Sequence, residues 1–112
     1  MLNQTVLVGR IANDPELRET EDGIKVTNIT LAVPRSFKNE KGEYDTDFVD
    51  IVLWKGVAES TIEYCRKGDM VGVKGRLQTL KDKDDKTKIS VVAERVTFLS
   101  TKSQEKEQEV ER

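Results

Sequence analysis

The chain has no histidine, and this absence limits the chemistry that it can perform. Histidine is the commonest general acid–base group in enzymes and a frequent zinc ligand. The phosphate-binding loops G-x-x-x-x-G-K-[ST] and G-x-G-x-x-G are missing as well. The carboxylates lie mainly in polar, loop-like segments, where solvated surface charge is the simpler interpretation. We therefore expect no enzyme, no metal site and no cofactor.

Other shortages bear on the cellular compartment. The single cysteine, Cys65, cannot form an internal disulfide, which fits a reducing cytoplasm. No apolar run approaches the roughly 20 residues that are needed to cross a bilayer. The first residues, MLNQTVLVGR, lack the basic start and the long apolar region of a secretory signal. We expect a cytoplasmic protein without a membrane partner.

Charge is abundant but balanced. Charged residues make up 36% of the 112 residues, yet the net charge is only −2. This counts against a protein that binds polyanions by bulk charge alone. Because screening at physiological salt confines the field of a charge to about 8 Å, a local basic groove remains compatible with this balance.

Hydrophobic periodicity predicts five strands and one helix. The strands cover residues 5–11, 24–33, 48–56, 70–80 and 89–99. The helix covers residues 57–68, with Arg66 and Lys67 in its last turn and Gly68 where it stops. Polar hairpin tips over 39–47 and 81–88 follow the second and the fourth strand.

This order predicts an all-β fold, a five-stranded OB-fold barrel with one α-helix between the third and fourth strands. Gly9, Gly72 and Gly75 fall inside strands, where glycine marks bulges and sharp bends. We expect one domain over residues 1–100. Residues 101–112, with one aliphatic side chain and no periodic apolar face, are expected to form a short disordered charged tail.

The third predicted strand, FVDIVLWKG, divides its side chains unusually. Successive strand residues point to opposite faces, which gives one aliphatic face suited to a core. The other face carries Phe48 and the only tryptophan, Trp54, together with an aspartate, Asp50. Exposed aromatic rings of this kind serve as stacking platforms for nucleic-acid bases. A subunit interface, which is also rich in aromatic residues, is the rival interpretation.

Five segments in order resemble the bacterial single-stranded DNA-binding proteins over about residues 1–100. They are VLVGRIANDPELR, VTNITLAVPRSF, DFVDIVLWKGVAE, EYCRKGDMVGVKGRLQT and AERVTFL. The resemblance implies the OB fold, single-stranded DNA as the partner, a homotetramer and a nucleoid-associated location. It also implies that Phe37, Phe48 and Trp54 stack on bases.

Basic residues interleave with these aromatic positions, as a groove that follows a DNA backbone requires. Lys74 and Arg76 lie on the strand face opposite Val71 and Val73, and the others neighbour the aromatic residues or a hairpin tip. The predicted phosphate contacts are Arg10, Arg35, Lys38, Lys55, Lys74, Arg76 and Lys81.

Two departures from the family pattern leave alternatives open. Asp82 stands where the family carries a further stacking aromatic, and the tail ends in EKEQEVER without an apolar tip, so partner recruitment through it is not expected. The chain resembles a short-tailed paralogue or a mobile-element version, or a truncation. The leading interpretation is a sequence-tolerant binder acting in replication, recombination, repair or DNA uptake. The alternative is an OB-fold protein–protein adaptor with weak DNA binding.

Overall fold

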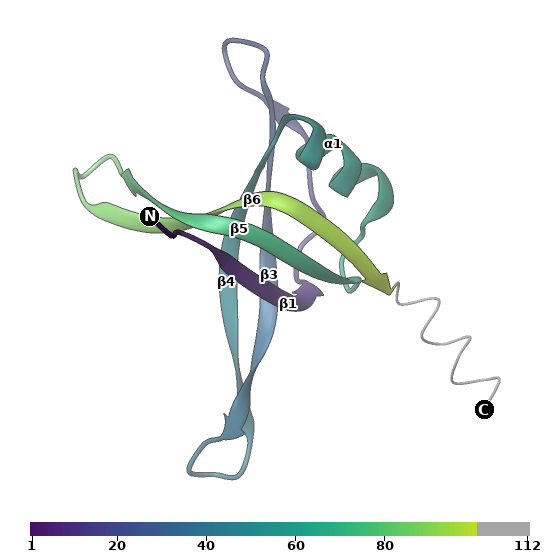
Figure 1. Cartoon of the computed structure of the whole chain (residues 1–112), viewed down its shortest axis with the longest axis vertical. Coiled ribbons are helices and arrows are strands. Elements are labelled where there is room, and N and C mark those ends of the chain that lie inside the picture. Colours follow the sequence, from purple (N-terminus) through teal and green to yellow (C-terminus); the bar gives the residue numbers. More distant parts are fainter. Residues whose placement is uncertain (101–112) are drawn as a thin grey trace, which may run out of the picture.

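The computed structural model describes residues 1–100, so the predicted tail at 101–112 lies outside the described residues. Six strands and one helix follow the order β1, β2, β3, β4, α1, β5, β6 (Figure 1). Their bounds are β1 Thr5–Ile11, β2 Arg18–Glu19, β3 Lys25–Lys38, β4 Tyr44–Trp54, α1 Lys55–Tyr64, β5 Met70–Lys81 and β6 Thr87–Ser100. The two-residue β2 is an addition to the predicted five strands.

The long strands close into a barrel. Neighbouring strands follow the order β1-β5-β6-β4-β3-β2, and an additional pairing of β1 with β3 closes the circle. The pairing of β4 with β6 is parallel, and the others are antiparallel. This closed barrel, with one helix between β4 and β5, confirms the predicted OB fold.

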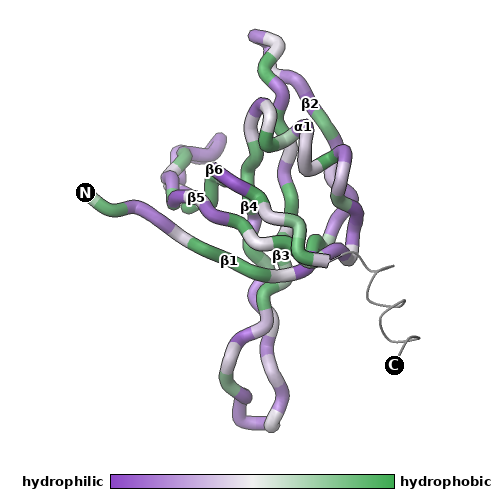
Figure 2. The backbone as a smooth tube through the Cα atoms, turned by 45° about the vertical axis from the view of Figure 1, so that its right-hand side comes forward, coloured by the Kyte–Doolittle hydropathy of each residue, from purple (hydrophilic) through white to green (hydrophobic). Residues whose placement is uncertain are grey.

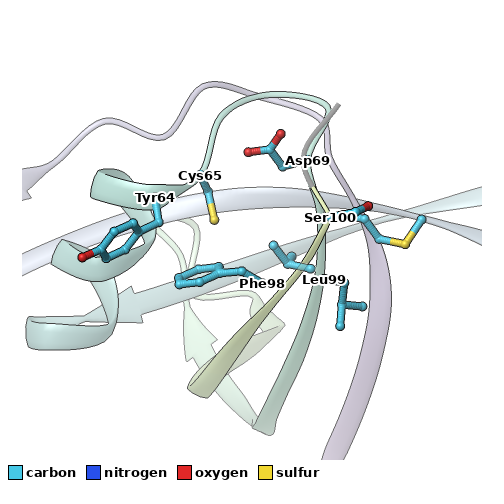
Figure 3. A pocket seen from close by; sticks show the side chains of 8 residues that line it. Tyr64, Cys65, Asp69, Phe98, Leu99 and Ser100 are labelled. Atoms are coloured by element: carbon cyan, nitrogen blue, oxygen red, sulfur yellow. The ribbon is translucent and has the colours of Figure 1, made fainter. Parts of the chain in front are cut away.

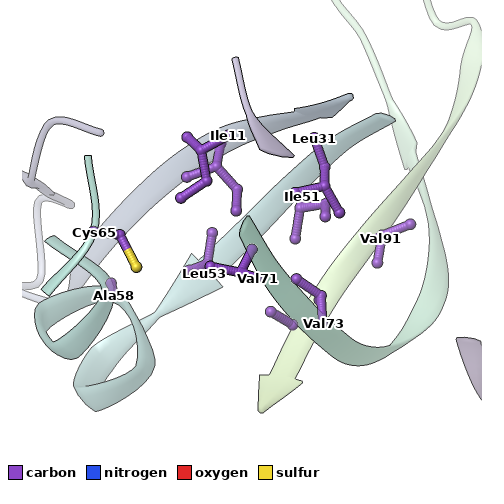
Figure 4. Packing of buried hydrophobic residues seen from close by; sticks show 11 residues of the cluster. Ile11, Leu31, Ile51, Leu53, Ala58, Cys65, Val71, Val73 and Val91 are labelled. Carbon is purple, nitrogen blue, oxygen red and sulfur yellow. The ribbon is translucent and has the colours of Figure 1, made fainter. Parts of the chain in front are cut away.

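The barrel interior is aliphatic. Ile51 and Leu53 from β4 lie in it, as the alternation of the third predicted strand requires, and Cys65 packs beside Ala58 from α1 (Figure 4). All six aromatic side chains of the sequence lie outside this core with substantial exposure. Aromatic side chains are the largest source of apolar burial in most small domains, so their placement here calls for a functional reason.

Two glycines allow close backbone contacts where the barrel bends. A Cβ on Gly9 would lie 2.3 Å from the carbonyl oxygen of Ala32, at the point where β1 passes from β5 to β3. A Cβ on Gly75 would lie 2.2 Å from the carbonyl oxygen of Val92, beside a register shift between β5 and β6. Gly9 and Gly75 agree with the prediction that strand glycines mark bends, whereas at Gly72 the nearest atoms to an added Cβ would be 3.9 Å away and no close approach requires glycine.

Two hairpin arms extend from the barrel (Figure 1). The predicted tips are too long, because the strands of both hairpins continue through most of the polar segments and leave turns of only residues 39–43 and 82–86. The turns share one design: the Asn39 side-chain oxygen accepts the amides of Lys41 and Glu43, and the Asp82 carboxylate does the same two and four residues further on. The turns are stabilised by these side-chain hydrogen bonds and not by apolar contacts. Hydrophobic periodicity in the sequence therefore gives no sign of how far the strands extend.

Hydrophilic residues concentrate towards the turns, as Figure 2 shows along the backbone. Leu77 lies on the same alternating face of β5 as Val71 and Val73, yet it is about half exposed. The reason is that β5 leaves the barrel after Gly75 and continues into the arm, where the inward face has no core to meet.

The helix is displaced from its predicted position. It begins at Lys55 and ends at Tyr64, rather than spanning 57–68. Arg66 and Gly68 belong instead to the turn that enters β5, where the Asp69 carboxylate accepts the Arg66 amide and the Gly68 amide bonds to Ile11. These bonds stop the helix before the Arg-Lys-Gly signal is reached. Within residues 1–100 no helix is long and apolar enough to cross a membrane.

Candidate nucleic-acid interface

The outward face of β4 carries an aromatic column. Phe48 is 67% exposed and Trp54 is 39% exposed, whereas the alternating Ile51 and Leu53 are fully buried. The alternation of strand side chains places every second residue on the outward face. The aromatic column therefore consists of Tyr44, Thr46, Phe48, Asp50, Val52 and Trp54.

Tyr44 was missed by sequence reasoning, because it was assigned to a polar hairpin tip. In the structure it is the first residue of β4, is well exposed, and shares the parity of Phe48 and Trp54. The Lys38 ammonium lies 5.8 Å from the centre of its ring, which is within cation–π range. The sequence contained one indication of this role, because Tyr44 precedes Phe48 by four residues and so falls on the same face of a continuous strand. To use it, the predicted strand would have had to extend back through residues 45–47.

Phe37 lies on the β3–β4 arm and is exposed, as expected. It falls within the register shift that begins at Pro34, a residue that cannot donate to a strand ladder, and ends at Lys38. The register shift interrupts the alternation of side chains there, so the evidence for Phe37 is its exposure and its place on the arm, and its role in stacking stays a prediction.

Two predicted arginines flank the aromatic column. Arg10 pairs with Ala32, which pairs with Phe48, and these three residues form one row across β1, β3 and β4. On the other side Arg76 pairs with Val92, which in turn pairs with a column residue of β4. Each arginine thus lies two strands, about 10 Å, from the column. The Arg10 guanidinium also donates to the Gly68 carbonyl at 3.0 Å.

Arg18 is a further flanking cation that sequence reasoning did not select. It pairs with Val26, which pairs with Trp54, so it stands two strands from the tryptophan. Its guanidinium donates to the Asn28 side-chain oxygen at 3.1 Å. The two-residue strand that positions Arg18 has no hydrophobic pattern, so only the pairing shows its place.

A groove of about 320 Å³ lies between the aromatic column and the β5–β6 arm. Asn28, Asp50 and Val52 line its β3–β4 side. The arm supplies Leu80, Lys81, Asp82, Lys88, Ile89 and Ser90. Apolar, cationic and polar groups therefore surround a space within the usual range for small-ligand sites.

Several predicted phosphate contacts are already engaged with carboxylates. Arg35 donates through Nη2 to Asp47 at 2.9 Å and lies 3.8 Å from Asp45. The hydrogen bond from Arg35 lowers the pKa of Asp47 from its ordinary value, and the same bond raises the pKa of Arg35. Because these pairs are exposed, DNA phosphates can compete with them at small cost.

Other predicted cations vary in their availability. Lys81 lies 3.5 Å from Asp85 in the arm's turn, and Arg76 lies 3.9 Å from Glu94. Lys55 begins α1 directly after Trp54 with a left-handed φ of 55° and has no ion pair among residues 1–100. Lys74 is also unpaired among these residues, but it stands opposite Val6 and outside the groove.

Asp82, which stands where the family carries a further stacking aromatic, has a structural role. Its carboxylate accepts two turn amides and lies 3.9 Å from the Lys88 ammonium. An aromatic side chain at this position could not cap the turn in the same way. Another aromatic side chain must then supply the stacking contact that the family makes here. Tyr44 is exposed, and the alternation of β4 places it on the same face as Phe48 and Trp54.

A second hollow, of about 240 Å³, lies at the other end of the barrel (Figure 3). The Tyr64 and Phe98 rings meet there with centroids 5.7 Å apart, and Cys65 lies close to them. Burial raises the pKa of the Cys65 thiol to about 11, so it is not a reactive thiolate near neutral pH. Cys65 therefore serves as a small apolar side chain of the core.

Comparison with known proteins converges on one group. The profile of the Single-strand binding protein family matches residues 2–99. Single-stranded DNA-binding protein B of Bacillus subtilis (strain 168) is 46% identical over 110 residues, which cover 95% of this chain and 97% of that protein. Single-stranded DNA-binding protein 2 of Staphylococcus aureus (strain COL) is 46% identical over 111 residues, with 96% and 80% covered.

The Single-stranded DNA-binding protein of Oceanobacillus iheyensis (strain DSM 14371) is 47% identical over 106 residues, which cover 91% of this chain and 66% of that protein. The chain thus spans nearly the whole of the first relative and somewhat less than two thirds of the third.

Proposed function

Because the chain belongs to the single-strand binding protein family and binds single-stranded DNA, we propose that bases stack on its aromatic column while the flanking cations hold the phosphates. The observation that carries this proposal is the position of the aromatic side chains: none is spent on the core, and three share the outward face of β4. Protecting and organising single strands in replication, recombination, repair or DNA uptake follows as the wider role, in the cytoplasm and close to the nucleoid.

Affinity in this proposal comes mainly from stacking. Each base–aromatic contact contributes about 1–3 kcal/mol, whatever the base, because every base has a π-face. The three platforms of the column therefore supply about 3–9 kcal/mol before the cost of ordering the strand, and the predicted platform Phe37 on the β3–β4 arm adds a further contact of the same kind. The arginines of the flanking strands and the lysines of the two arms add a salt-dependent term. Sequence-tolerant binding is the expected result.

Quenching of Trp54 fluorescence by an oligo-dT strand tests the proposal directly, since Trp54 is the only tryptophan. Saturable quenching is expected, and duplex DNA of the same length should quench far less because its bases are already stacked. Replacing Lys55 by alanine removes one phosphate ion pair and should reduce the slope of log affinity against log salt by about 0.7. Quenching that is absent, or equal for duplex and single strand, would refute the proposal.

We also propose that the chain assembles as a homotetramer. Within residues 1–100, the first five residues of β1 pair with β5 on one side only, so their other edge is free. Val6 and Val8 on this strand are exposed. A free, apolar edge invites pairing with a second copy. Light scattering at micromolar concentration should give a mass of four chains, and a monomeric mass would exclude this assembly.

The adaptor alternative uses the same aromatic column as a protein interface. The near-neutral net charge and the engagement of Arg35 with carboxylates favour it. It predicts that Trp54→Ala changes assembly or partner binding and leaves DNA affinity unchanged. Measuring mass, thermal unfolding and the affinity for a fluorescently labelled oligo-dT on the same Trp54→Ala sample separates the two functions, because the unfolding curve accounts for lost stability and the variant has no tryptophan of its own.

A further inference from the structure

One residue of the aromatic column does not suit stacking or phosphate contact. Asp50 lies between Phe48 and Val52, is exposed, and lines the groove. A carboxylate repels phosphates, so its presence in the middle of a DNA-binding face opposes binding unless it contacts another part of the nucleotide. The part that offers hydrogen-bond donors is the edge of the base.

One hydrogen bond holds the Asp50 carboxylate in place, and about three of its four acceptor sites remain free, on both oxygens. Thr30 stands directly opposite it in the register, and the Thr30 hydroxyl donates to Asp50 Oδ1 at 3.1 Å. Asp50 Oδ2 has no hydrogen-bond or ion-pair partner among residues 1–100. An ionised carboxylate only accepts, so Asp50 can satisfy two donors on one partner.

The rest of the groove dictates how a nucleotide lies in it. Lys81 and Lys88 are on the arm side, where they attract the phosphate, although each also approaches an aspartate of the arm. Val52 and Leu80 provide apolar surface for the face of a base. A nucleotide whose phosphate meets the arm lysines therefore turns its base edge towards Asp50 on the opposite wall.

The four bases differ in what they offer to an acceptor. On its Watson–Crick edge guanine presents two adjacent donors, the ring N1–H and the exocyclic 2-amino group. Thymine offers one donor there, and cytosine and adenine offer one amino group beside a ring nitrogen that repels a carboxylate. Only guanine can pair with both oxygens of Asp50 without such repulsion.

We propose that Asp50 makes one subsite of this otherwise sequence-tolerant face selective for guanine. The proposal rests on the proposed function, because it requires the strand to lie along the aromatic column. Stacking still binds any base at the other positions. The selectivity arises from a bidentate contact of the carboxylate with the N1–H and 2-amino groups.

Inosine isolates this contact, since it has the ring and the stacking surface of guanosine but lacks the 2-amino group. Three oligonucleotides of equal length are compared by quenching of Trp54: oligo-dT, oligo-dT with isolated dG residues, and the same strand with deoxyinosine at those positions. The parent protein should bind the dG strand about 5- to 150-fold more tightly than oligo-dT. When this preference is expressed as a difference in binding free energy, the inosine strand should retain no more than half of it.

Asp50→Asn should abolish the difference between dG and deoxyinosine while keeping or raising the affinity for oligo-dT, because a repelling charge is removed. Asp45→Asn is the matched control, since it removes one exposed charge from the opposite face of the same strand and should leave the preference intact. Equal binding of dG and deoxyinosine strands by the parent, or an unchanged preference in Asp50→Asn, would overturn the inference. Either result leaves the proposed function standing if oligo-dT still quenches Trp54, and the absence of quenching by every strand would instead remove the proposed function.

Discussion

Phe48→Ala is the sharpest test of the stacking mechanism, and the structure explains why it is better than Trp54→Ala. Phe48 is 67% exposed, so only about a third of its side chain is hidden from solvent. A fully buried aromatic side chain hides about 150–250 Å², which makes the hidden part about 50–80 Å². At about 25 cal/mol per Å², its loss costs roughly 1–2 kcal/mol of stability.

Trp54 is only 39% exposed, so more than half of its side chain is packed. By the same estimate its removal costs about 2–4 kcal/mol of stability, although Trp54 lies on the face opposite the core. A weaker affinity of Trp54→Ala would therefore mix lost stacking with lost stability. Phe48→Ala keeps the two effects apart.

The expected result is a loss of about 1–3 kcal/mol in the free energy of binding oligo-dT, which is about 5- to 150-fold in affinity. The loss should be similar for oligo-dT and oligo-dC, since stacking does not depend on the identity of the base. The assay is quenching of Trp54, which this variant retains, together with thermal unfolding of the same sample. Phe48→Tyr keeps the ring without adding a second tryptophan to the signal, and it should restore most of the affinity.

Phe98→Ala is the matched control, because Phe98 is an exposed phenylalanine that contacts Tyr64 outside the aromatic column. Its affinity for DNA should equal that of the parent protein. If Phe48→Ala remains folded and binds as tightly as the parent, or if Phe98→Ala loses as much affinity, the aromatic column is not the stacking surface.

Three further predictions follow from single side chains. Tyr44→Ala should weaken the binding of strands that are long enough to reach the β3–β4 arm by about 1–3 kcal/mol and leave the binding of short strands unchanged. Tyr44→Phe should restore the affinity, and an equal loss for all strand lengths would argue against a subsite on the arm. Gly75→Ala should cost about 3 kcal/mol or more in chemical denaturation, because its Cβ would lie 2.2 Å from the Val92 carbonyl oxygen, while Gly72→Ala, whose nearest atoms are 3.9 Å away, should be nearly neutral. The Cys65 thiol, with its pKa raised to about 11 by burial, should resist alkylation at pH 8 until the protein unfolds. Its contribution to the free energy of unfolding should be complete below pH 9 and decline between about pH 9 and 11, because the unfolded chain releases the thiol proton first; Cys65→Ala should remove that decline.

Local patterns in the sequence were enough to predict the order of the main elements and the two faces of β4. Alternation requires only neighbouring residues, so the opposite orientations of Ile51 and Trp54 could be predicted without any tertiary information. The glycines at the barrel bends were also predictable, because glycine weakens a strand interior and is found there mainly where the backbone bends or approaches another strand closely. The family could be recognised from five short segments in order.

The ends of the elements and the set of cations near the aromatic column depend on contacts between residues that are far apart in the sequence. The helix stops at Tyr64 because Asp69 and Ile11 hold the following turn, and Ile11 lies more than fifty residues away in sequence. Arg18 lies near the aromatic column only because β2 pairs with β3 and β3 pairs with β4. A strand pattern shows which face a side chain takes, but the residues that share that face come from other strands, and their register is set by barrel closure.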